Sequence, residues 1–173
     1  MTIRGIDLAK QSMMDALDLA ILVEEEAQER YEEFAAQMEQ HHTPEAARFF
    51  RTMVENEAKH GMELTERRVQ LYAAAPRKVT RAMIWGVEAP DYDAARAFMS
   101  PRAAMEAALA SEIKAQAFFD AALPGIQDAE VRALFLELRD EEVQHQALVR
   151  AALARLGPDG PDFGHVEDEP VAQ

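Results

Sequence analysis

Two glutamate and histidine pairs in the sequence have the spacing of metal ligands on a helix. They are Glu57 with His60 and Glu142 with His145. Residues three apart lie on the same face of an α-helix, so each pair can direct a carboxylate and an imidazole to one point. Apolar residues lie seven positions before and after each glutamate, namely Phe50, Leu64, Phe135 and Val149. Both pairs are therefore predicted to face a core, where charged groups require a compensating partner.

A further glutamate in the first third of the chain is predicted to point inward. Glu24 is in helical phase with Leu17 and Tyr31, whereas its neighbour Glu25 is in phase with Asp18. The acidic residues of this region that we expect to face water are Asp7, Asp15, Asp18, Glu25 and Glu32.

An internal repeat identifies a matching glutamate, Glu112, in the second half. The series Ala20, Glu24, Ala27 and Tyr31 recurs with identical offsets as Ala108, Glu112, Ala115 and Phe119. A second series, Glu45, Phe50, Glu57, His60 and Leu64, recurs as Glu130, Phe135, Glu142, His145 and Val149. Two copies of a helical hairpin predict a pseudo-twofold bundle whose axis passes between the two glutamate and histidine pairs.

The predicted inward residues have the composition of a two-metal site: Glu24, Glu57, His60, Glu112, Glu142 and His145. Four buried carboxylates would repel one another and lose hydration, whereas two divalent cations neutralise their charge. Such ligation, with one imidazole per ion, favours two iron ions, or manganese or another divalent metal, over structural zinc.

Each residue of this set has a predicted role. Glu57 and Glu142 would bridge ions about 3.5 to 4 Å apart, which can give electrons to O2 or peroxide. Glu24 and Glu112 would be terminal ligands. Tyr31 is the catalytic candidate, placed to hydrogen-bond a ligand or a bound oxygen species. Glu141 stays an alternative to Glu142, because only the spacing to His145 and the phase with the apolar positions separate the two.

Four amphipathic helices are predicted to position these residues. Their predicted ranges are about 7–42, 44 to 73–76, 101–123 and 129–156, with Thr43, Ser100 and Asp128 as N-caps. The long connection 76–100 carries an apolar patch, residues 82–85 with Trp85, which should hold it to the core. The expected fold is all-α, a four-helix bundle over residues 1–157 with a long crossover between the second and third helices. Residues 158–173 are expected to be a mobile acidic tail in which Phe163 alone looks able to dock.

Composition narrows the classes of function. The net charge of −14, from 32 acidic and 18 basic residues, disfavours nucleic acid and anionic membranes as partners and favours cations. The absence of cysteine excludes disulfides, iron–sulfur clusters and a thiol nucleophile. With no segment of membrane-spanning length and no signal pattern at the N-terminus, we expect a cytoplasmic protein of one domain.

On these residues the chain resembles the ferritin-like superfamily and, within it, the rubrerythrin family of non-haem diiron proteins. The resemblance covers roughly residues 17–156 and rests on Glu24 with Tyr31, Glu112 with Phe119 and the two Glu-x-x-His pairs. It implies a ferritin-like four-helix bundle that binds two irons and forms homo-oligomers, with a dimer favoured. It also implies an oxidoreductase active under oxidative stress, which oxidises Fe(II) with O2 or peroxide or reduces hydrogen peroxide. The electron donor is not defined by the resemblance.

The chain departs from the family pattern in two places. Without cysteine it has no rubredoxin domain, and Ala115 stands where rubrerythrins often have a further glutamate. The set of four glutamates and two histidines resembles that of bacterioferritins, but no methionine stands out as a haem ligand, so no haem is expected. These departures favour ferroxidase or iron-handling chemistry over peroxidase turnover. Two alternatives are an iron-sequestering or delivery protein and a helical interaction module with a structural metal site.

Overall fold

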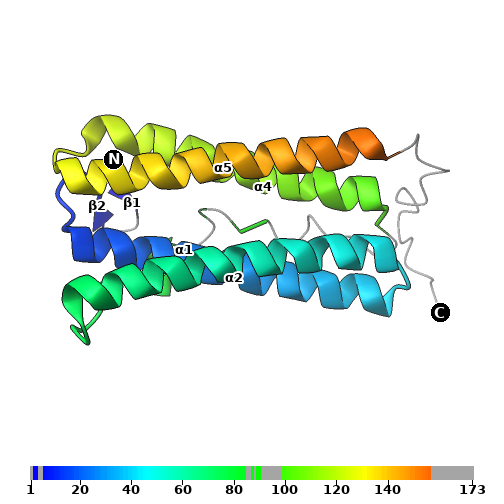
Figure 1. Ribbon diagram of the computed structural model, residues 1–173, viewed down its shortest axis with the longest axis horizontal. Coiled ribbons are helices and arrows are strands. Elements are labelled where there is room, and N and C mark those ends of the chain that lie inside the picture. The colour runs from blue at the N-terminus through cyan, green and yellow to red at the C-terminus, as the bar shows by residue number, and fades with distance from the viewer. Residues whose placement is uncertain (1, 4–5, 85–86, 88, 91–98, 157–173) are drawn as a thin grey trace, which may run out of the picture.

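The computed structural model describes residues 2–3, 6–84, 87, 89–90 and 99–156. Four long helices form a bundle: α1 (Met13–Gln40), α2 (Pro44–Tyr72), α4 (Pro101–Ala122) and α5 (Ala129–Arg155) (Figure 1). The short elements are β1 (Thr2–Ile3), β2 (Ile6–Asp7), α3 (Arg81–Ile84) and the 3-10 helix η1 (Leu123–Gly125). The all-α four-helix fold is therefore as predicted, while Trp85 and the tail 158–173 with Phe163 lie outside the described residues.

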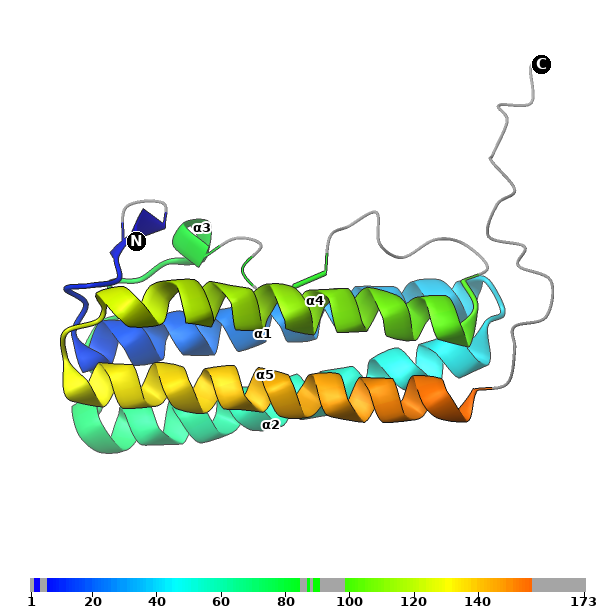
Figure 2. The same ribbon diagram turned by 90° about the horizontal axis from the view of Figure 1, so that it is seen from above.

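The bundle consists of two antiparallel hairpins, α1 with α2 and α4 with α5. Seen from above, α2 and α5 lie along one side of the bundle and α1 and α4 along the other (Figure 2). Helix α3, in the connection between the hairpins, lies on the side of α1 and α4. Two contacts fix this connection further along, because Arg30 donates to the Pro90 carbonyl at 2.7 Å and Lys114 to the Ala89 carbonyl at 2.7 Å.

The helix starts follow local hydrogen-bonding chemistry. The Ser100 hydroxyl accepts from Ala103 N–H, and the Asp128 carboxylate accepts from two backbone N–H groups of α5, as predicted. Thr43 occupies the predicted N-cap position of α2, but its hydroxyl donates to the Met38 carbonyl and makes no capping hydrogen bond.

The start of the first helix was predicted six residues too early. Ser12 and Asp15 form a capping box that begins α1 at Met13. The residues before it include the antiparallel strands β1 and β2. Among the described residues, no helix has the length and apolar content to cross a bilayer.

Two apolar clusters fill the bundle, one on each side of its middle. One contains Leu17, Phe119, Phe135 and Leu138 and their neighbours. The other contains Tyr31, Phe34, Phe50, Met53 and their neighbours. Along each long helix the predicted metal ligands fall between residues of the two clusters, so the charged layer lies between two apolar ones.

Asp18 was predicted to face water, and this was wrong. Its side chain is 0% exposed, and Arg68 of α2 donates to both of its carboxylate oxygens. The helical phase misled because residues 16–24 of α1 are all buried. Leu8, Val79 and Ile84 add further cover from outside the bundle, so this part of α1 has no face left for water.

Candidate metal centre

All four long helices send acidic side chains into the layer between the apolar clusters. Each of the six predicted ligands is buried except His60, which is half-buried; the set is Glu24, Glu57, His60, Glu112, Glu142 and His145. Burial of this many carboxylates is costly without cations or protons, because each loses its hydration.

Two compact groups of donor atoms lie in this layer. Ligand atoms of Glu112, Glu142 and His145 all lie within 4.8 Å of one another, and so do those of Glu57, His60 and His145. The two imidazole rings are parallel, with centroids 4.9 Å apart and an interplanar angle of 3°. The structure thus places His145 in both groups and brings the two Glu-x-x-His pairs face to face.

Glu24 belongs to neither group but lies beside one of them. Its Oε2 is 4.0 Å from His60 Nδ1, whereas in the other half Glu112 Oε2 is 3.0 Å from His145 Nδ1. The six predicted residues therefore lie in one layer, with Glu24 connected to it through His60.

The donor set suits divalent metal ions. Bonds of about 2.1 Å hold the ligand atoms around one ion roughly 3 to 4 Å apart. The separations of 3.0 Å between Glu112 and His145 and 4.0 Å between Glu24 and His60 lie in this range. Burial lowers the pKa of His60, and the neighbouring His145 lowers it further. A lowered pKa favours the neutral imidazole, which is the form that binds a metal.

Tyr31 lies at the edge of the layer and contacts a predicted ligand. Its hydroxyl donates to Glu112 Oε1 at 3.1 Å, and its ring stacks on Phe50 with centroids 6.0 Å apart. The tyrosine therefore orients the glutamate of the other hairpin, a partner that its position on the Glu24 helix did not indicate. At the repeated position Phe119 has no hydroxyl.

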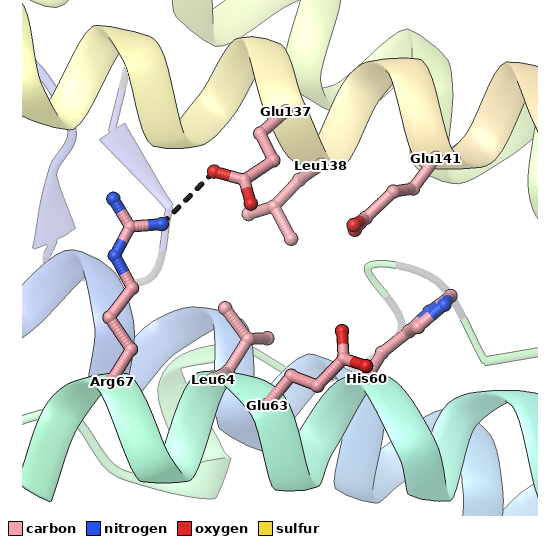
Figure 3. Close-up of a pocket in the computed structure, with 7 residues that line it drawn as sticks. All are labelled: His60, Glu63, Leu64, Arg67, Glu137, Leu138 and Glu141. Atoms are coloured by element: carbon pink, nitrogen blue, oxygen red, sulfur yellow. Dashed lines mark hydrogen bonds and ion pairs between the residues drawn. The ribbon is translucent and has the colours of Figure 1, made fainter.

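The structure separates Glu142 from its neighbour Glu141. Glu142 points into the layer, whereas Glu141 lines a pocket of about 50 Å³ between α2 and α5. Figure 3 shows this pocket, with His60 and Glu63 on α2 facing Glu141 on α5 and with Arg67 bonded to Glu137. The carboxylate expected from the spacing, and not the alternative, is thus the one beside Glu112 and His145.

A second pocket between the same two helices is apolar. It measures about 270 Å³, and His145 is one of the residues that line it. Its other lining residues are Phe49, Thr52, Met53, Asn56, Leu148, Val149 and Ala152. Each imidazole therefore borders a pocket on the α2 and α5 side, His60 an acidic one and His145 an apolar one.

Sequence reasoning missed one buried polar residue at the site, Gln146. Its amide nitrogen lies 3.3 Å from the Glu112 carbonyl oxygen and 2.7 Å from Gln116 Oε1. The signal was a break in the repeat, because Gly61 follows His60 where Gln146 follows His145.

Comparisons with known proteins agree with this geometry. A family model described as Rubrerythrin matches residues 15–153. The solved structure of an uncharacterised conserved protein from Magnetospirillum magnetotacticum MS-1 is similar, with 25% sequence identity and a TM-score of 0.68. The match covers 87% of this chain and 99% of that one. No curated protein matches the chain. Because the family model extends over most of the bundle and includes every residue of the charged layer, the chain belongs to the rubrerythrin family.

Proposed function

We propose that the chain is a diiron oxidoreductase that oxidises Fe(II) with O2 or peroxide, or reduces hydrogen peroxide. The observation that supports it most directly is the pair of donor groups that share His145 within a buried carboxylate layer. Isolated buried carboxylates serve no packing purpose, whereas two divalent ions would neutralise all four.

Each residue of the layer would have its own role in binding the two ions. Glu57 and Glu142 would bridge the two ions, and Glu24 and Glu112 would each bind one of them. When bound, two iron ions supply the electrons that reduce O2 or peroxide. Tyr31 holds a proton at its hydroxyl oxygen, donates it in the hydrogen bond to Glu112 and so orients that carboxylate. The apolar clusters on both sides keep bulk water from the layer.

Metal analysis with an oxidation assay tests this function. The wild-type chain is expected to bind two irons and to oxidise added Fe(II), whereas Glu57→Ala should lose both properties because a bridging carboxylate is gone. Glu55→Ala, at an exposed position of the same helix, is the matched control and should keep both. Metal at about 100 times its dissociation constant should also raise the free energy of unfolding of the wild type by about 2.7 kcal/mol. Unchanged oxidation by Glu57→Ala would contradict the proposal.

A second candidate is an iron-sequestering or delivery protein. It is favoured by the net charge of −14, which attracts cations. Assembly size and iron content separate the two functions: a closed shell with many irons per chain supports storage, and a dimer that stops at two irons supports the enzyme.

We propose that the protein is a homodimer in the cytoplasm. Exposed apolar side chains such as Met62, Leu71 and Leu148 support the dimer, because they could form the surface through which two chains associate. If removing metal lowered only thermal stability, a structural metal site would be the better account.

A further inference from the structure

The proposed two-metal function makes no use of the apolar pocket that His145 lines. This pocket lies between α2 and α5 and measures about 270 Å³. An apolar cavity of about 150 Å³ is large enough to hold benzene, so the pocket has room for two fused rings. O2 and hydrogen peroxide have two heavy atoms each and would fill only a small part of it. The volume therefore fits a larger molecule than the oxidant.

The residues that line the pocket range from buried to exposed. Met53 and Val149 are each 3% exposed, and His145 is 7% exposed. Leu148, in contrast, is 63% exposed. The pocket thus connects the surface of the molecule with a predicted metal ligand, and a molecule bound in it would contact the imidazole of His145.

Two of the apolar side chains favour an aromatic occupant. The ring of Phe49 lies against that of Phe50, with centroids 5.9 Å apart, so its position is supported by the core. Met53 adds a thioether to the buried part of the lining. Aromatic rings interact favourably with other rings and with thioether sulfur, beyond the burial of their surface. The lining therefore suits a flat ring system.

Two polar side chains, Thr52 and Asn56, interrupt the apolar lining. The Thr52 hydroxyl donates to the Arg48 carbonyl at 3.2 Å, whereas no hydrogen bond joins the Asn56 amide to another described residue. A side-chain amide both donates and accepts hydrogen bonds. Asn56 can therefore bind a single hydroxyl or carbonyl group of a ligand.

The charge of the surroundings excludes an ionic ligand. Among the described residues that line the pocket there is no aspartate, glutamate, lysine or arginine, so neither a cation nor an anion would find a counter-charge. The net charge of −14 also repels anions from the whole molecule. The ligand that fits is therefore uncharged.

From these observations we propose that the pocket binds an uncharged aromatic molecule of one or two fused rings with a hydroxyl or carbonyl group. Phe49 and Met53 contact the ring, Asn56 binds the polar group, and the ring system reaches His145. Binding needs no metal, so the inference goes beyond the proposed two-metal function and does not depend on it.

Titration of the metal-free full chain with 2-naphthol tests the site. This probe is fluorescent, uncharged at neutral pH and the size of two fused rings. We expect saturable binding of one molecule per chain, with a dissociation constant on the order of 0.1 mM for about 11 non-hydrogen atoms. In NMR spectra the probe should shift the signals of His145 and leave those of His42 unchanged. Absence of saturable binding would overturn the inference, whatever metal the chain binds.

A variant pair locates the probe. Ala152→Phe places a ring in the pocket and should abolish saturable binding. Ala151→Phe, at an exposed position of the same helix, is the matched control and should bind 2-naphthol as the wild type does. Unchanged binding by Ala152→Phe would mean that the probe binds elsewhere and would overturn the inference.

A probe pair tests the recognition of the polar group. Asn56→Ala should weaken binding of 2-naphthol about fivefold to tenfold, because one hydrogen bond is lost, and should leave binding of naphthalene unchanged. Equal weakening of both probes would overturn the role of Asn56.

Two further outcomes would assign the pocket to another occupant. Binding of 2-naphthol that appears only at low protein concentration would indicate that a second copy of the chain fills the pocket. Binding that appears only in Phe163→Ala would indicate that the C-terminal segment fills it. Either result would overturn the inference.

Discussion

Glu141 and Glu142 are neighbours in sequence but lie in different surroundings, because successive helix residues are turned by 100°. Glu142 joins the donor group with Glu112 and His145, whereas Glu141 borders the pocket between α2 and α5. Burial raises the pKa of Glu141, and the nearby carboxylate of Glu137 raises it further. Folding therefore favours the protonated form of Glu141 in the apoprotein.

This pKa shift predicts a pH-dependent effect of Glu141→Gln. A carboxyl group whose pKa is raised by folding stabilises the protein below its unfolded pKa, here 4.5, and that contribution is lost as the pH rises through the folded pKa. Since glutamine stays neutral, the variant should gain more stability over the wild type at about pH 8 than at about pH 5. Urea unfolding of the two apoproteins measures the difference. An equal gain at both pH values would mean that Glu141 is ionised alike in the folded and unfolded chains.

Among the helices of the described residues, α2 is the one that contains a glycine in its middle. Gly61 lies between His60 and Met62 and costs helix stability, because glycine loses more backbone freedom on folding than any other residue. Its position has room for a methyl group, which would make ordinary contact with Glu24 Cβ.

Gly61→Ala should therefore stabilise the protein. The expected gain is about 1 kcal/mol, or an increase in Tm of about 2 to 4 °C. Thermal unfolding of the apoprotein checks it, and the reverse change Ala58→Gly on the same helix should lower the Tm by a similar amount. A loss of stability in Gly61→Ala would mean that the contact with Glu24 is tighter than its geometry indicates.

Helix ends with a local chemical signal were predictable, and those without one were less so. Ser100 before Pro101 and Asp128 before Ala129 identified two starts correctly. The start at Met13 was missed because residues 7–12 contain no glycine or proline to interrupt a helix, and the capping box of Ser12 and Asp15 was not recognised. Helical phase and the internal repeat together identified the six residues of the layer, because both depend only on helix geometry.

Contacts between helices were the part that the sequence did not reveal. Gln146 is polar, so a pattern of hydrophobicity assigns it to the surface, and its burial depends on a hydrogen bond to Gln116 of α4. Similarly, the partner of Tyr31 is on the other hairpin and 81 residues away. Asp18 was misplaced for the same reason, because its burial depends on Arg68 from another helix.

At the scale of the whole molecule, the ion pair of Asp18 and Arg68 connects α1, α2 and the start of the long connection. Arg68 also donates to the Ala75 carbonyl at 2.7 Å, and Arg77 lies 3.6 Å from Asp18. The Arg68 guanidinium thus donates both to the Asp18 carboxylate on α1 and to the Ala75 carbonyl beyond the end of α2. Removing its anion would leave the buried guanidinium with backbone carbonyls but without an opposite charge.

Asp18→Ala is accordingly expected to lower the free energy of unfolding by about 3 to 5 kcal/mol. Glu32→Ala, an exposed change on the same helix, is the control and should stay within about 0.5 kcal/mol of the wild type. Urea unfolding at neutral pH measures both. A loss below about 1 kcal/mol for Asp18→Ala would indicate that water reaches Arg68 and replaces the carboxylate.

The hydrogen bonds from Arg30 and Lys114 to the carbonyls of Pro90 and Ala89 hold this part of the long connection against α1 and α4. The two pockets that border the imidazoles lie between the other two helices, α2 and α5. If ions and oxidant reach the proposed centre through these pockets, a molecule bound over α2 and α5 would block them, whereas one bound over the connection would not.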